Sequence, residues 1–479
     1  KYAEAEEKFR AALQQDHNYL PALVKLAALL YRHMQYEEAL ALARRALSIN
    51  TYDGEANYYY GLINAQLNKT ADARDGWSIA ALSPAWRSAA YTELSKSYLA
   101  EKDLNRCLAY ADKAMSYNRY NIPALQLMAV AYRLQQNRTA AEAVLHTLLS
   151  YDTLNHFARF EAYLWEETAA HKTQFVSLIR NELPQETYIE LGIWYYTIGC
   201  AAEAEKVFEL CPPAAEASYW LSFLQHRKVN FSGTDATLFF PARPETAHLI
   251  AQLLAGDDSW MLKYHLALIY RNSNRLEESR ALLAACANEP GVAPFYAVRA
   301  GMLEEKDTAA ALADLQRALR LDSGWRYHKL LTEYYIRHRE NEEALSMAGA
   351  WYKSHPDQYI MGMLYAKTLL LNKQYATCNQ LLASLQIIPF EGATASREYY
   401  RETQLMLAVS GMKQRHYKPA LQFVEKAGEW PEHLGVGKPY PEDIDDRLEN
   451  WITFLCNKRL HRKNGNAALE KILQFNAGR

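Results

Sequence analysis

The chain contains few of the residues that interrupt helices. Its 479 residues include 19 glycines and 16 prolines, about 4% and 3% of the chain against a usual ~7% and ~5%. Half of the residues are hydrophobic and 23% are charged, a balance that supports a packed core and excludes a disordered chain. We therefore expect a folded protein that consists mainly of α-helices.

A charge imbalance and long apolar runs are also missing. Lysine and arginine number 53 against 55 acidic residues, which leaves a formal net charge of −2. This balance excludes a general attraction to nucleic acid or to an anionic membrane. No uncharged apolar run approaches the ~18 residues of a membrane span, and residues 1–6 do not resemble a signal peptide. We expect no nucleic-acid partner and no membrane span.

The cysteines and histidines form no metal-binding motif. The six cysteines include no CxxC, and the 14 histidines include no HExxH pair, so we expect no metal and no cofactor. Four cysteines occupy positions where small residues recur and are expected to act as compact hydrophobic side chains: Cys107, Cys211, Cys286 and Cys378. Reduced thiols favour a cytoplasmic protein, although a periplasmic or secreted protein is also compatible with the sequence.

Small residues recur every 34 positions. One series is Ala5, Ala39, Ala73, Cys107 and Ala141, and another is Ala27, Gly61, Ser95 and Ala129. Small side chains are needed where two helices cross closely, and large ones fill the remaining space. Helix pairs that cannot bury their apolar faces alone stack on their neighbours. The period and its small residues resemble the tetratricopeptide repeat (TPR). The resemblance implies an all-α fold, an α/α superhelix of about ten helix-pair repeats in two arrays with a C-terminal helical cap.

The pattern divides the chain into four segments. We expect an N-terminal TPR array over 1–155, an irregular helical segment over 156–185, a second array over 186–428 with an irregular insertion near 225–256, and an ordered loop with capping helices over 429–479. The chain opens in the second helix of a repeat. Because terminal repeats need a polar cap, we expect the native protein to extend upstream of residue 1.

Four segments outside the repeat pattern carry a narrower resemblance. Residues 155–161, 240–245, 389–393 and 430–440 are similar to the C-terminal part of a bacterial family of large TPR proteins. In that family a mutarotase-like β-sandwich domain of unknown function precedes the repeats. The resemblance implies a carbohydrate-associated protein whose upstream domain is absent from this chain.

The TPR resemblance also implies a concave face lined by the first helix of each repeat. Its expected binding residues are Tyr31, Arg32, Tyr58, Lys96 and Arg133 in the first array and Tyr264, Arg271 and Lys329 in the second. Such an aromatic and basic lining suits an extended peptide, or a glycan stacked on tyrosine. The alternative is that many of the 34 tyrosines fill the space between repeats.

The segment 430–440 contains a sequence that resembles a phosphate-binding loop only in part. The glycines Gly435 and Gly437 precede Lys438, but Glu432 stands at the first glycine position and Pro439 at the hydroxyl position. We therefore predict an ordered loop that docks onto the concave face or onto an upstream domain. The expected docking residues are Trp430, Gly435, Gly437 and Tyr440.

No residues match a catalytic constellation, so we expect this chain not to be an enzyme. The favoured function is a non-catalytic protein-binding or scaffolding module with a peptide or protein partner. The alternative is an accessory platform packed on an upstream carbohydrate-active β-sandwich domain, either glycoside hydrolase-like or glycan-binding.

Overall fold

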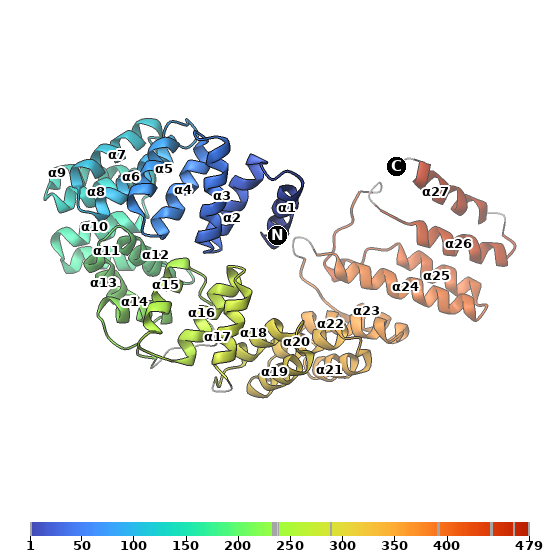
Figure 1. Ribbon diagram of the computed structural model, residues 1–479. Helices are drawn as coiled ribbons and strands as arrows, with labels where there is room; N and C mark the ends of the chain where they lie inside the picture. Colours follow the sequence, from blue (N-terminus) through green and yellow to red (C-terminus); the bar gives the residue numbers. More distant parts are fainter. Residues whose placement is uncertain are drawn as a thin grey trace. The chain divides into compact units, whose positions relative to one another are not determined.

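The computed structural model describes residues 2–231, 237, 239–287, 290–389, 393–440, 444–462 and 465–477. The regular elements among these residues are all helices, and no strand occurs among them (Figure 1). This confirms the predicted all-α class. No helix in the described part of the chain is long and apolar enough to cross a membrane.

The chain divides into two compact units, 1–290 and 291–479. The helices of the first unit are α1 (Tyr2–Gln15), α2 (Leu20–Arg32), α3 (Tyr36–Ile49), α4 (Gly54–Gln66), α5 (Thr70–Ala80), α6 (Arg87–Ala100), α7 (Leu104–Tyr117), α8 (Ile122–Leu134), α9 (Arg138–Tyr151), α10 (His156–Glu166), α11 (Ala169–Ser177), α12 (Pro184–Thr197), α13 (Ala201–Leu210), α14 (Ala215–Leu224), α15 (Pro244–Leu253), α16 (Trp260–Asn272) and α17 (Leu276–Ala285).

The helices of the second unit are α18 (Ala293–Leu303), α19 (Thr308–Leu321), α20 (Trp325–Arg337), α21 (Asn341–Ser354), α22 (Tyr359–Leu371), α23 (Tyr375–Ser384), α24 (Ala395–Lys413), α25 (Tyr417–Ala427), the short 3-10 helix η1 (Glu432–Leu434), α26 (Arg447–Arg459) and α27 (Gly465–Ala477). The division near residue 290 coincides with neither of the two predicted irregular segments, and the predicted four-segment boundaries remain sequence predictions.

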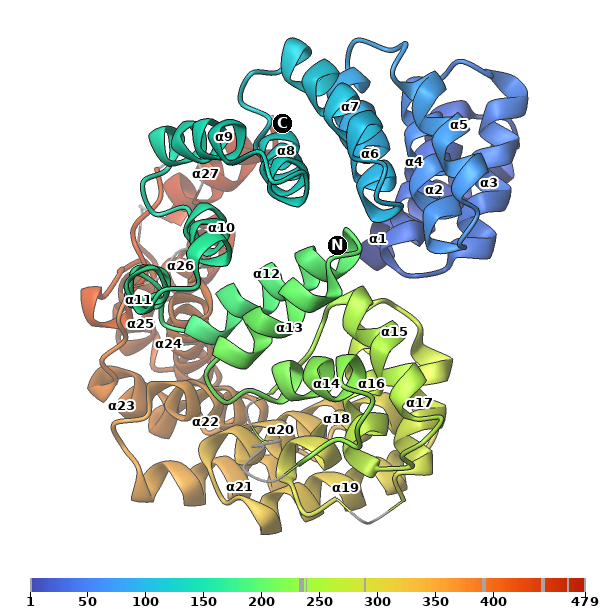
Figure 2. The ribbon, with the colours of Figure 1, turned by 90° about the vertical axis from the view of Figure 1, so that its left-hand side faces the viewer.

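Helix pairs of the first unit stack through columns of small residues. In Figure 2 the pairs α4–α5 and α6–α7 are neighbours, and α5 contacts α6 directly. One column of alanines opens the first helix of five successive repeats at steps of 34 and is at most 1% exposed: Ala22, Ala56, Ala90, Ala124 and Ala158. A side chain larger than glycine does not fit at Gly61, where a Cβ would lie 2.4 Å from Trp77 Nε1. Small first-helix residues and large second-helix residues therefore pack as the period predicts.

The ends of the first helices are fixed by polar caps and left-handed turns. The side chains of Asp53, Asn121 and Asn155 accept hydrogen bonds from backbone amides in the first turns of α4, α8 and α10, as N-cap residues do. A residue with positive φ ends the first helix of four successive repeats, again at steps of 34: Met34, Asn68, Lys102 and Gln136. The register thus holds from α2 to α10.

Turns of distant repeats meet within the first unit. Lys102, between α6 and α7, donates from Nζ to the Gly199 carbonyl between α12 and α13 at 2.7 Å. Gly199 has φ +75°, and a Cβ there would lie 3.1 Å from the Ala100 carbonyl oxygen. Asn274, after α16, donates to Glu6 of α1 at 3.2 Å. The first unit is therefore cross-linked between repeats that are far apart in the sequence.

The cysteines take no part in disulfides. All six lie among the described residues and are free. Cys107, Cys286 and Cys378 are buried as expected, whereas Cys211 is only half-buried. Burial raises the pKa of the Cys107 thiol to about 11, so at neutral pH this side chain is a neutral, compact packing group.

Candidate functional site

Four aromatic side chains connect three successive first helices. Tyr31 comes from α2, Tyr58 and Tyr59 from α4, and Trp86 caps α6. The ring centroids lie 6.2 Å apart for Tyr31 and Tyr59, and 4.8 Å apart for Tyr58 and Trp86. Each of the four residues keeps part of its surface exposed. We call these four side chains the aromatic row.

Nearby carboxylates raise the pKa values of two tyrosines in the aromatic row. Burial is the main cause that raises the pKa of Tyr31, and the nearby Glu93 and Glu245 raise it further. Burial likewise raises the pKa of Tyr58, with Glu93 adding to the effect. No cation lies over the rings of Tyr31, Tyr58, Tyr59 or Trp86 in the part of the chain that the structure describes. The charge beside the row thus differs from the basic lining expected from the sequence.

Glu93 is the central charged group of this region. Its residue is half-buried on α6. Burial raises the pKa of its carboxyl group, and Lys96 and the Tyr58 hydroxyl oppose this effect without cancelling it. No described cation approaches the Glu93 carboxylate within 4.0 Å. A carboxylate thus lies beside aromatic rings without a close ionic partner.

A second glutamate occupies the same repeat position and does have such a partner. Glu161 of α10, two 34-residue periods after Glu93, is fully buried. Arg133 Nε donates to Glu161 Oε2 at 2.7 Å, and the Tyr195 hydroxyl donates to Glu161 Oε1 at 2.7 Å. Arg133 also pairs with Glu203 at 3.0 Å. Arg133, expected to face a ligand, is therefore bound within the protein.

Of the remaining expected binding residues, three lie close together and the others are dispersed. Tyr31, Tyr58 and Lys96 come together around Glu93, and Arg32 is exposed on α2 beside Tyr31. Tyr264 of α16 is completely buried, and Arg271 of the same helix is exposed. Lys329 belongs to the second unit and pairs with Glu333 at 2.7 Å. Sequence reasoning missed Tyr59, Trp86 and Glu93, although the period places Glu93 in register with Glu161.

Half of the predicted docking loop is bound to its own unit. Arg397 lies over the Trp430 ring, 4.5 Å from its centroid. Gly435 has φ +70°, and a Cβ there would lie 2.7 Å from the Ile387 carbonyl oxygen. The later half differs: a Cβ at Gly437 would meet nothing within 4 Å, and Tyr440 is 75% exposed. Docking onto another surface stays a prediction for Gly437 and Tyr440.

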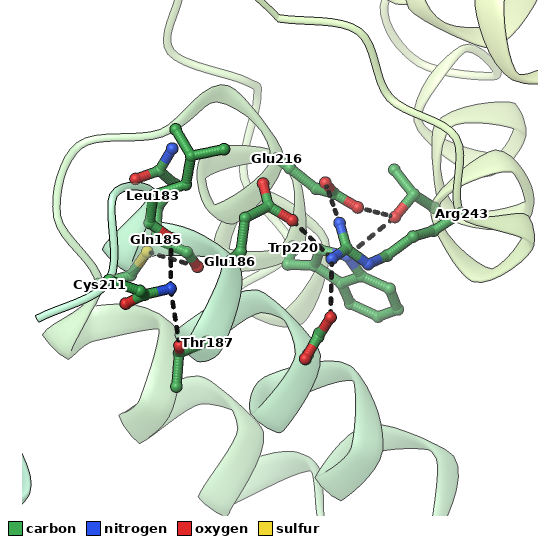
Figure 3. Close-up of polar contacts among 11 residues, drawn as sticks. Leu183, Gln185, Glu186, Thr187, Cys211, Glu216, Trp220 and Arg243 are labelled. Carbon is green, nitrogen blue, oxygen red and sulfur yellow. Dashed lines mark hydrogen bonds and ion pairs between the residues drawn. The ribbon is translucent and has the colours of Figure 1, made fainter. Parts of the chain in front are cut away.

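The segment 240–245 supplies a structural ion-pair cluster (Figure 3). The guanidinium of Arg243 lies between two carboxylates, 2.7 Å from Glu186 and 3.1 Å from Glu216. Glu216 is 1% exposed and also accepts a hydrogen bond from the Thr246 hydroxyl. Burial raises the pKa of Glu216, and Thr246 and Arg243 oppose that effect. Arg243 therefore fastens the start of α15 to α12 and α14.

The other segments of the narrower resemblance have similar roles or cannot be placed. The segment 155–161 contributes the Asn155 cap and the buried Glu161. Within 389–393, residues 390–392 lie outside the described residues. The described parts of 155–161 and 240–245 thus anchor helices through buried glutamates that pair with arginine.

Comparisons with known proteins give matches only among solved structures. No protein-family model and no curated protein matches the chain. Among solved structures, it is similar to one described as Naa15/Naa10 bound to HypK-THB, with 13% identity over 99% of this chain and 78% of that chain and a TM-score of 0.27. It is similar to yeast Tom70, with 13% identity over 99% and 96% of the two chains and a TM-score of 0.29.

A third similar structure is a tetratricopeptide repeat protein from Parabacteroides merdae, with 12% identity over 52% of this chain and 95% of that chain and a TM-score of 0.28. The fold assignment itself rests on the helix pairs and on the buried small residues at steps of 34. The chain has the TPR solenoid fold.

Proposed function

We propose that the chain is a non-catalytic protein-binding module and that the aromatic row binds an extended peptide segment of a protein partner. The observation that carries the proposal is the row itself, in which Tyr31, Tyr59, Tyr58 and Trp86 connect three repeats and remain partly exposed. Tyrosine and tryptophan offer large contact areas at a low cost in side-chain entropy, and they are enriched among residues that dominate binding energy.

The spacing of the row suits an extended chain. Helix α2 packs directly against α4, and packed helices lie roughly 8–10 Å apart. An extended peptide rises about 3.3 Å per residue, so about every third residue would meet a new helix. Helices α2 and α4 would then contact about four residues of a ligand, and Trp86 at the start of α6 would extend that contact.

A display selection followed by calorimetry tests this proposal. Random heptapeptides would be selected on the purified protein, and the selected peptides titrated into wild type and into a Tyr31→Ala/Arg32→Ala/Tyr58→Ala variant. We expect the variant to lose at least about tenfold in affinity, which corresponds to about 1.4 kcal/mol. A Tyr117→Ala/Tyr120→Ala variant is the matched control. These tyrosines are 58% and 56% exposed and lie at the end of α7 and in the turn after it, outside the aromatic row. Unchanged affinity in the triple variant would contradict the proposal.

Two narrower hypotheses from the sequence make different predictions for the same protein. If the rings stack on sugars, a glycan array rather than a peptide library yields ligands that depend on Tyr31 and Tyr58. If the chain is a platform for an upstream β-sandwich domain, that domain, expressed separately, binds this chain in a calorimetric titration. The peptide proposal is preferred because the carboxylate of Glu93 beside the row gives it a second, charged contact.

A further inference from the structure

One pair of positions recurs between successive first helices of the first unit. Each pair joins a residue near the end of one first helix to a residue 28 positions later, in the middle of the next. The four pairs, taken in order, are Tyr31 with Tyr59, Ala65 with Glu93, Leu99 with Leu127, and Arg133 with Glu161. We call them the cross-repeat pairs. Because the register holds from α2 to α10, the four pairs occupy equivalent repeat positions.

Three of the four cross-repeat pairs are complementary in chemistry. Tyr31 and Tyr59 form an edge-to-face ring pair with centroids 6.2 Å apart. Leu99 and Leu127 are 0% and 2% exposed in one hydrophobic cluster. Arg133 and Glu161 form a buried ion pair. In each of these pairs, both residues have a partner of matching chemistry: ring with ring, apolar with apolar, or cation with anion.

The Ala65–Glu93 pair is the exception. Ala65 is exposed and offers no polar atom in its side chain, so the place that the Arg133 side chain occupies two repeats later has no equivalent group. The hydroxyl of Tyr58, from the preceding repeat, opposes the rise in the pKa of Glu93, whereas the Tyr195 hydroxyl that donates to Glu161 comes from a later helix, α12. Lys96 acts on Glu93 electrostatically but forms no ion pair with it among the described contacts. The site therefore shares a glutamate and a nearby tyrosine with the Arg133–Glu161–Tyr195 arrangement, although its tyrosine comes from the preceding repeat, and it lacks the arginine.

We propose that the carboxylate of Glu93, with Tyr58 and the open position beside Ala65, binds an arginine side chain of the peptide ligand. This inference rests on the proposed function and specifies its ligand as a segment that contains arginine. The guanidinium would take the place that Arg133 takes against Glu161, where it makes contacts of 2.7 and 3.4 Å to the two carboxylate oxygens.

Arginine fits this site better than lysine does. A guanidinium is planar, donates to both oxygens of one carboxylate and stacks on aromatic faces, whereas an ammonium is a compact and strongly hydrated charge. The Tyr58 ring, whose hydroxyl acts on Glu93, supplies such a face, and the Trp86 ring lies next to it with centroids 4.8 Å apart. Removing either charged partner from a buried hydrogen-bonded pair carries a large penalty.

The first test needs no ligand. The substitution Ala65→Arg supplies the missing arginine from within the chain, and a double-mutant cycle with Glu93→Gln measures whether the two positions couple. We expect Ala65→Arg to raise the melting temperature of the wild-type protein, and to lower it or leave it unchanged in the Glu93→Gln background. An Ala71→Arg variant, at an exposed residue of α5, is the control for added charge. An absence of coupling would overturn the proposed geometry.

The second test uses peptides selected from the random heptapeptide library. We expect arginine to be enriched on wild type, and the versions of a selected peptide with Lys or Gln in place of Arg to bind at least about tenfold more weakly. Glu93→Gln and Ala65→Arg should abolish the preference for arginine, whereas Asp75→Asn, which removes an exposed carboxylate from α5, should keep it.

The outcomes separate this inference from the function on which it rests. Peptides that depend on Tyr31 and Tyr58 but show no preference for arginine would overturn the inference and leave the peptide-binding proposal standing. Equal binding of the Arg and Lys versions would overturn the guanidinium assignment. A selection that yields no peptides dependent on Tyr31 and Tyr58 would overturn both proposals.

Discussion

Two regions of the first unit place a glutamate at the same repeat position and treat it differently. Between α8 and α13, Glu161 is enclosed and bound by Arg133 and Tyr195. Between α4 and α6, Glu93 keeps part of its surface exposed and has no guanidinium beside it among the described residues. The same repeat position thus serves cohesion between repeats in one region and holds a carboxylate without a described ionic partner in the other. In a solenoid, the same repeat position can therefore hold neighbouring repeats together in one repeat and serve a ligand in another.

The tyrosines of the first unit divide in the same way. On α6 and α7, Tyr98 and Tyr110 stack with centroids 5.4 Å apart. Arg74 lies 4.0 Å from the centroid of the Tyr98 ring, and Lys113 lies 4.9 Å from that of Tyr110. The aromatic row has carboxylates beside it instead. Cations from the chain itself already cover the first group of tyrosines, whereas the second group has ring faces that no described cation covers.

Removing Arg133 should have the largest effect on stability. Arg133→Ala leaves Glu161 buried without its cation, and such a loss costs about 3–5 kcal/mol. Glu93→Gln should change the free energy of unfolding by less than about 1 kcal/mol, because its residue is partly exposed and no ion pair is lost. Urea unfolding of the two variants at neutral pH measures the difference. Equal losses would show that the two glutamates are equivalent after all.

The Leu99–Leu127 pair supplies a matched rescue for that experiment. A buried ion pair can often be replaced by apolar residues at little cost, so Arg133→Leu/Glu161→Leu should recover most of the stability that Arg133→Ala loses. Burial raises the pKa of Glu161, so the loss in Arg133→Ala should be greatest at neutral pH. It should shrink as the pH falls and the carboxyl becomes protonated. A loss that does not depend on pH would point to lost packing instead.

The affinity for an arginine peptide should depend on pH through Glu93. Burial raises the pKa of this carboxyl group, while Lys96 and the Tyr58 hydroxyl lower it. Only the ionised carboxylate attracts a guanidinium, so affinity should fall as the pH drops through that raised pKa. Calorimetric titrations across mildly acidic pH measure it, and Glu93→Gln should remove the dependence. A dependence that persists in Glu93→Gln would assign the titration to another group.

The sequence predicted the repeat because its period is local. Buried alanines such as Ala22 and Ala56 and the space-limited Gly61 are needed by the packing of neighbouring helices, so they recur at a fixed step. The helical class, the buried Cys107 and the gathering of Tyr31, Tyr58 and Lys96 around Glu93 follow from that step.

The partners of individual side chains could not be predicted in the same way. Arg133 meets Glu161 28 residues later and Glu203 further on, and Lys102 reaches Gly199 97 residues away. These contacts depend on how the repeats curve, which the period does not encode. Tyr264 was expected at a surface and is buried, in a part of the chain where the 34-residue register is interrupted and positions cannot be transferred from earlier repeats.

The smallest predicted effect concerns the tyrosines that the chain covers with its own cations. Replacing Arg74 by alanine removes a cation from the Tyr98 ring, an ion pair with Glu101 and two hydrogen bonds to Ser97. Because these contacts are only partly buried, the loss in unfolding free energy should be about 1 kcal/mol, and its ionic part should shrink at high salt. Peptide affinity should not change. If Arg74→Ala weakened peptide binding, the α6–α7 tyrosines would belong to the binding surface, and the distinction between covered and accessible rings would fail.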